Sequence, residues 1–117
     1  MKRENIIQTK SFDFALVIIK LYTQLVEEKE YVISKQLLRC GTSIGSNVEE
    51  ALAGYSRKDF LCKMSISSKE ARETRYWLRL LKHSELTQVN LDSILEDINQ
   101  IINILTSIVK TTQHSNS

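Results

Sequence analysis

Residues 91–110 have the sequence LDSILEDINQIINILTSIVK, and this stretch decides the fold class. Its apolar residues recur at spacings of three and four, which matches one face of an α-helix with 3.6 residues per turn. The apolar seam consists of Leu91, Ile94, Ile98, Ile101, Leu105 and Ile108, opposed by Glu96, Asn99, Gln100, Asn103 and Ser107. With Asn90 as an N-terminal cap, the pattern predicts an amphipathic helix over about 90–112.

The preceding segment shows a second seam of this kind. Ser56 and Asp59 form a near capping box, with Asp in place of the usual Glu, and predict a helix over about 56–84. Its apolar and small residues follow alternating spacings of four and three: Phe60, Met64, Ser67, Ala71, Thr74, Leu78 and Leu81. Because the centre of this seam has small side chains, we expect another helix to approach it closely.

A third helix is expected over about 34–53, organised by Leu37, Gly41, Ile44 and Val48. Its middle, residues 41–46, is a run of small residues in which each interior glycine costs about 1 kcal/mol relative to alanine. The run lacks both a Walker lysine and GxGxxG spacing, which excludes a phosphate-binding turn. It therefore predicts tight packing against a neighbouring helix.

The first helix is expected over about 11–28, with Ser11 as its cap and Asp13 near the positive end of the helix dipole. It carries two adjacent apolar rows. One row is Phe12, Ala15, Ile19, Tyr22 and Val26, and the second is Phe14, Ile18, Leu21 and Leu25. This arc is wider than one face of a bundle requires, so either the helix is deeply buried within the monomer or the second row packs against another subunit. We take Phe14, Ile18, Leu21 and Leu25 as the candidate oligomer interface.

The whole composition agrees with an all-α chain. At 117 residues, 42% hydrophobic and without proline, it fits a single domain over residues 1–117 with one core. Short connections between long helices predict an antiparallel up-down-up-down four-helix bundle. No apolar run approaches the roughly 20 residues of a membrane span, and residues 1–10 are too polar for a secretory signal, so we expect a cytoplasmic protein that does not bind membranes.

Patterns that would indicate catalysis or metal binding were sought and not found. Neither His83 nor His114 belongs to the Glu-x-x-His motif of di-iron bundles, and Cys40 and Cys62 have no zinc-ligand spacing. The pair Arg79 and His83 is too closely spaced for the arginine and histidine of small all-α nucleases. No Ser or Cys has a His and an acid that the sequence could place beside it. We therefore expect a protein that is not an enzyme and has no metal, cofactor or small-molecule substrate.

Positive charge is concentrated between Ser56 and Lys82, where eight Lys and Arg residues face three acidic ones. Arg72, Arg75, Arg79 and Lys82 fall within about a quarter of the helix circumference, and Arg57 lies on the same side. Such a stripe can bind phosphates of RNA or DNA, and Tyr76 beside it is a candidate contact for a base. Alternatively, the cations form a solvated face that is paired with Glu70, Glu73 or acids of the next helix.

Three short motifs in the middle of the chain resemble those of the 23S rRNA intervening-sequence proteins, a four-helix bundle family. They are Ser43, Asn47 and Glu50 in the pattern Ser-x-x-x-Asn-x-x-Glu, Ser56, Asp59 and Phe60 in Ser-x-x-(Asp/Glu)-Phe, and Glu70, Glu73 and Thr74 in Glu-x-x-Glu-Thr. Gly45 and Ala51 depart from the proline and glycine that are common in relatives. The resemblance implies a ring-like homopentamer with no catalytic residues. A more distant resemblance is to the accessory variability protein of diversity-generating retroelements, whose basic surface binds nucleic acid and reverse transcriptase.

Together these observations predict a non-catalytic, homo-oligomeric bundle that binds RNA or DNA. The candidate nucleic-acid-binding residues are Arg57, Arg72, Arg75, Tyr76, Arg79 and Lys82. The alternative is a protein–protein interaction or scaffold module whose basic face docks an acidic partner protein.

Overall fold

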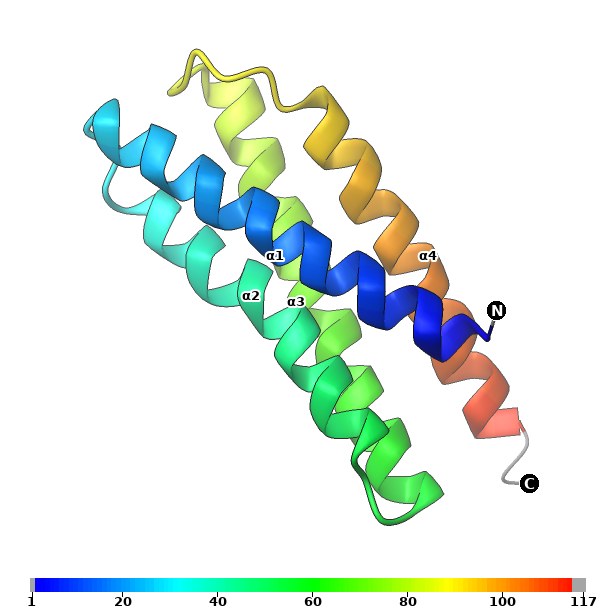
Figure 1. Ribbon diagram of the computed structural model, residues 1–117. Coiled ribbons are helices and arrows are strands. Elements are labelled where there is room, and N and C mark those ends of the chain that lie inside the picture. Colours follow the sequence, from blue (N-terminus) through cyan, green and yellow to red (C-terminus); the bar gives the residue numbers. More distant parts are fainter. Residues whose placement is uncertain (1, 115–117) are drawn as a thin grey trace.

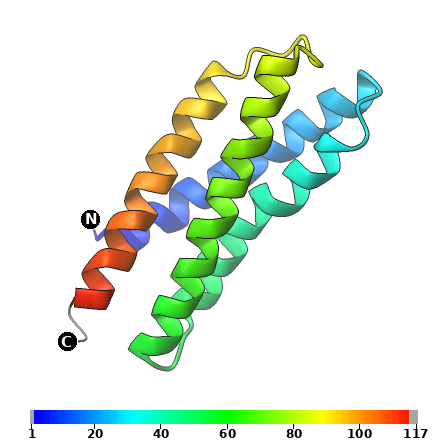
Figure 2. The same ribbon diagram turned by 180° about the vertical axis from the view of Figure 1, so that it is seen from behind.

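The computed structural model describes residues 2–114 and confirms an all-α four-helix bundle (Figure 1). The helices are α1 (Arg3–Glu27), α2 (Ile33–Leu52), α3 (Arg57–Ser84) and α4 (Asp92–His114). Successive helices run antiparallel and form a rod of 48 × 24 × 21 Å. Seen from behind, α3 lies between α4 and α2 along most of its length (Figure 2).

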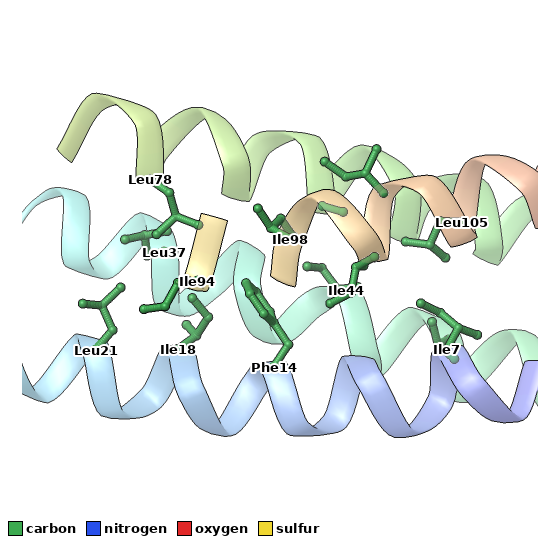
Figure 3. Close-up of a cluster of buried hydrophobic side chains, with 14 of the residues drawn as sticks. Ile7, Phe14, Ile18, Leu21, Leu37, Ile44, Leu78, Ile94, Ile98 and Leu105 are labelled. Carbon is green, nitrogen blue, oxygen red and sulfur yellow. The ribbon is translucent and has the colours of Figure 1, made fainter. Parts of the chain in front are cut away.

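The core is a mostly aliphatic hydrophobic layer that includes Phe14, and every helix contributes to it (Figure 3). The predicted seam of α4 is buried along its whole length, and so is the seam of α3 from Met64 to Leu81. Each fully buried Leu or Ile contributes about 1.5–3 kcal/mol relative to an exposed one, so burial of these seams, together with the buried faces of α1 and α2, drives folding. Phe60, at the start of the α3 seam, is half-buried against the core.

Helix α1 begins at Arg3, so the predicted start at Ser11 is wrong. Ser11 lies inside the helix, 1% exposed, and its hydroxyl donates to the Gln8 carbonyl at 3.2 Å. The physical reason is that the buried seam of α1 continues toward the N-terminus as far as Ile7. In the sequence, Ser11 resembled an N-terminal cap. In the structure, it lies on the buried face of α1, where its small side chain lets α2 approach closely.

The burial of the two apolar rows of α1 is the reverse of the prediction. The row proposed as a subunit interface is buried, and residues of the other row are exposed. Phe14, Ile18, Leu21 and Leu25 are at most 2% exposed and belong to the core of the monomer, so they cannot form the predicted subunit interface. With Ile7 and Ser11 they make a continuous four-three seam, which is the pattern of one buried helix face. In the other row, Phe12 and Ile19 are 61% and 45% exposed.

Side chains cap the other helices close to the predicted starts. Ser56 accepts from the Asp59 amide at 3.1 Å, as the near capping box predicts, and α3 begins at Arg57. Asn90 Oδ1 accepts from the Asp92 amide at 2.9 Å, where α4 begins. At the start of α2, Glu30 accepts from the amides of Val32, Ile33 and Ser34. Such caps satisfy amides that have no partner within the helix.

Candidate nucleic-acid interface

The basic stripe, Arg72, Arg75, Arg79 and Lys82, lies on the side of α3 that faces solvent and the edge of α4. Arg72, Arg79 and Lys82 are exposed and Arg75 is half-buried. Arg75, Arg79 and Lys82 line a shallow open groove whose other wall includes Leu95 and Asn99 of α4. With a rise of 1.5 Å per residue, the stripe extends about 15 Å along the helix axis.

Two of the three stripe arginines, Arg72 and Arg75, have neutral hydrogen-bond partners on α4. Arg72 donates to Thr106 Oγ1 at 3.0 Å, and Arg75 donates to Asn99 Oδ1 at 3.1 Å. Within residues 2–114, Arg79 makes no ion pair or side-chain hydrogen bond. Residues of α4 therefore position the guanidinium groups of Arg72 and Arg75 without neutralising their charge.

The acids of α3 that could have neutralised the stripe face the other way, toward α2. Arg39 pairs with Glu73 and lies 3.5 Å from Glu70. Glu73 also accepts from Trp77 Nε1 at 3.0 Å. The alternative of a stripe paired with Glu70 and Glu73 therefore does not apply.

The other three candidate residues have different neighbours from those of Arg72, Arg75 and Arg79. Lys82 forms an ion pair with Asp92 of α4 at 2.9 Å, so an acid of the next helix compensates its charge. Arg57 lies at the opposite end of α3, about 22 Å along the axis from Arg72, beside Phe60 and Ile108. Tyr76 is 54% exposed and makes an edge-to-face contact with Trp77. The structure thus brings the stripe and Tyr76 together and leaves Arg57 apart.

The motif residues that α2 and α3 supply make structural contacts. Asn47 donates to the Ser43 carbonyl at 2.8 Å within α2, and Thr74 is buried with its hydroxyl on the Glu70 carbonyl. Glu50 pairs with Lys63 of α3 at 3.0 Å and raises the pKa of that ammonium through its hydrogen bond and charge. The Glu50–Lys63 ion pair therefore joins α2 to α3, whereas the Asn47 and Thr74 hydrogen bonds each lie within one helix.

The described residues offer little for other chemistry. Residues 2–114 contain no group of three or more His, Cys, Asp or Glu side chains placed to hold a metal ion. Cys40 is buried, which raises the pKa of its thiol, and Cys62 is exposed. His83 is exposed beside the stripe, and no helix in this part of the chain is long and apolar enough to cross a membrane.

A surface that the sequence interpretation missed lies on the outside of α1. Phe12, Leu16 and Ile19, here named the α1 outer stripe, are 61%, 54% and 45% exposed. Their spacing of four and three places them on one face. The sequence prediction put Phe12 and Ile19 in the row beside the candidate interface and left Leu16 out of both rows. Beside Phe12, a second groove runs between α1 and α2, with Ala15, Thr42 and Gly45 in its lining.

Comparisons with known proteins agree with the motifs. No functionally curated protein matches the chain. A crystal structure of a protein with unknown function from the S23 ribosomal protein family of Bacteroides thetaiotaomicron VPI-5482 is 48% identical, with a TM-score of 0.89, and the match covers 93% of this chain and 99% of that one. Residues 3–107 match the family model described as 23S rRNA-intervening sequence protein. The chain therefore belongs to the 23S rRNA-intervening sequence protein family.

Proposed function

We propose that this protein is a cytoplasmic, non-catalytic bundle that binds RNA or DNA through Arg72, Arg75 and Arg79. The observation that carries the proposal is the separation of charge on α3. Glu70 and Glu73 are paired with Arg39, whereas the three arginines have neutral partners or none within residues 2–114. Uncompensated guanidinium groups in a row attract phosphates and can bind their oxygens bidentately.

We further propose that the protein is a homo-oligomer, as the family resemblance implies. The α1 outer stripe supports this, because a row of large apolar side chains in water is a common sign of a subunit contact. Repetition of the basic stripe in an assembly would let weak contacts in each subunit add up to appreciable affinity.

Charge reversal of the three arginines tests the proposal. We expect Arg72→Glu, Arg75→Glu and Arg79→Glu together to abolish binding to labelled RNA and DNA while helicity by circular dichroism is unchanged, since all three lie on the surface of α3. A matched control reverses the same charge on α1, α2 and their connection with the exposed residues Lys20→Glu, Lys29→Glu and Lys35→Glu. The control should retain binding, and affinity of the wild type should fall steeply with salt.

Equal loss of binding in both triple variants would show that only net charge matters and would contradict a specific interface. An acidic protein partner would use the same arginines, so a pull-down with and without nuclease separates the two cases. Capture that survives nuclease treatment and still requires the arginines would replace nucleic acid with a protein partner.

A further inference from the structure

Tyr76 lies between two arginines of the basic stripe on the outer surface of α3. Arg72 precedes it by four residues and Arg79 follows it by three, so all three side chains share one helix face. Tyr76 is 54% exposed, and the two arginines are also exposed. In this arrangement the aromatic ring can stack on a base, and the cation on either side of it can bind a flanking phosphate.

A series of side-chain contacts that leads to α2 supports the ring of Tyr76. The ring packs edge-to-face on Trp77, with ring centroids 5.4 Å apart and an interplanar angle of 69°. Trp77 donates to Glu73 at 3.0 Å, and Glu73 is paired with Arg39 of α2. A T-shaped neighbour covers at most one face of the tyrosine ring, so another face is left for a ligand. Because the ring is already supported, less side-chain freedom is lost on binding.

The packing of α3 disfavours insertion into a duplex. The major groove of B-DNA is about 12 Å wide and admits a single helix. Helix α3 has α2 on one side and α4 on the other along most of its length (Figure 2). A duplex can therefore meet this surface only through its phosphates, and its stacked bases offer no face to Tyr76. An unpaired strand can satisfy both the arginines and the ring.

We propose, on the basis of the nucleic-acid binding put forward above, that this face of α3 is a site for single-stranded nucleic acid. Tyr76 stacks on one unpaired base, and Arg72 and Arg79 bind the phosphates on its two sides. Arg75 adds a contact from the wall of the groove beside α4. Stacking is tolerant of base identity, so the site selects the strand state and not the sequence.

The test compares three variants on strands and duplexes. The probes are labelled oligouridylate, labelled oligodeoxythymidylate and a labelled mixed-sequence DNA duplex of the same length. Tyr76→Ala should lower affinity for both single strands by about 5- to 150-fold, the range measured for loss of one stacked base, and leave duplex affinity within about twofold. Tyr76→Phe keeps the ring and should retain single-strand binding. The control is Tyr31→Ala, because Tyr31 is 57% exposed and lies outside α3.

The outcomes separate this inference from the proposed function. If the wild type binds single strands through the arginines but Tyr76→Ala binds them equally well, the single-strand site is wrong and phosphate binding stands. If Tyr76→Phe loses as much affinity as Tyr76→Ala, the hydroxyl and not stacking is responsible, which also overturns the inference. If the wild type binds none of the three probes, the proposed function itself fails.

Discussion

Gly41 and Gly45 of α2 lie one turn apart and both face α1, but their surroundings differ. A Cβ at Gly41 would lie 2.9 Å from both Ile18 Cγ1 and Ile18 Cγ2. Ile18 is fully buried and β-branched, so its side chain has little freedom to move aside. A Cβ at Gly45 would meet the Ser11 carbonyl oxygen at 3.4 Å, which is an ordinary contact.

We therefore predict opposite effects for two alanine substitutions. Gly45→Ala should stabilise the protein by about 0.5–1 kcal/mol, because alanine removes the entropic cost of a glycine within a helix. Gly41→Ala makes the same gain but forces the Ile18 side chain or α1 to shift, at a cost of about 1–3 kcal/mol. We expect it to be less stable than wild type by up to about 2 kcal/mol, measured by urea denaturation with the two variants as each other's control. A Gly41→Ala protein as stable as Gly45→Ala would contradict the close approach of α1 and α2.

At the scale of elements, a single carboxylate joins the end of α1 to the connection between α3 and α4. Glu28, the residue after α1, accepts from the Thr87 hydroxyl and from the Gln88 amide at 2.9 Å. Thr87 Oγ1 in turn accepts from the Val89 amide at 3.1 Å. The hydrogen bond from Thr87, and then that from Gln88, lowers the pKa of Glu28 from its usual 4.5. The ionised form therefore stabilises this connection.

This contact predicts a pH dependence with a definite sign. Because the pKa of Glu28 is lower in the folded state, its contribution is present above about pH 4.5 and is lost as pH falls through the folded value. Glu28→Gln should lower the Tm near neutral pH, and the difference from wild type should shrink toward acid. The control is Glu27→Gln, which removes a neighbouring exposed charge. Thermal melts over a pH series would contradict the prediction if Glu27→Gln and Glu28→Gln gave the same profile.

On the scale of the whole molecule, the surface presents two different outer faces. The α1 outer stripe is apolar, whereas the outer face of α3 is basic. A bundle of this size can bury only one face of each helix, so the α1 outer stripe stays exposed, and we propose that it contacts another subunit. Assembly and ligand binding would then use separate helices.

We predict that charges in the α1 outer stripe prevent assembly without unfolding the bundle. Leu16→Glu and Ile19→Glu together should reduce the mass measured by light scattering to that of one 13.5 kDa chain, with unchanged helicity. Val32→Glu and Leu86→Glu together form the matched control, since both residues are exposed and lie outside the stripe. If the Leu16→Glu/Ile19→Glu variant keeps the wild-type mass, any assembly uses another surface. If it is a monomer and binds nucleic acid more weakly, the multivalent arrangement gains support.

Much of the architecture could be predicted because it depends on neighbours in the sequence. The seams of α3 and α4 and the Ser56 cap involve residues within one or two turns of each other, and they lie where expected. The start of α1 could not be placed, because Ser11 suits a cap and an inner position next to a glycine equally well. The burial of Ile7 one turn earlier and the presence of Gly45 of α2 beside Ser11 distinguish the two.

The candidate site was also only partly predictable from the sequence. The sequence by itself determined that α3 is a helix with Arg72, Arg75, Tyr76 and Arg79 on one side, because helical periodicity is local. Tertiary structure decided which row of α1 is buried and that Glu70 and Glu73 pair with Arg39. It also decided that Thr106 and Asn99 are the partners of Arg72 and Arg75. These outcomes depend on which helix packs on each side of α3, and that is set by the whole core and not by the residues next in the chain.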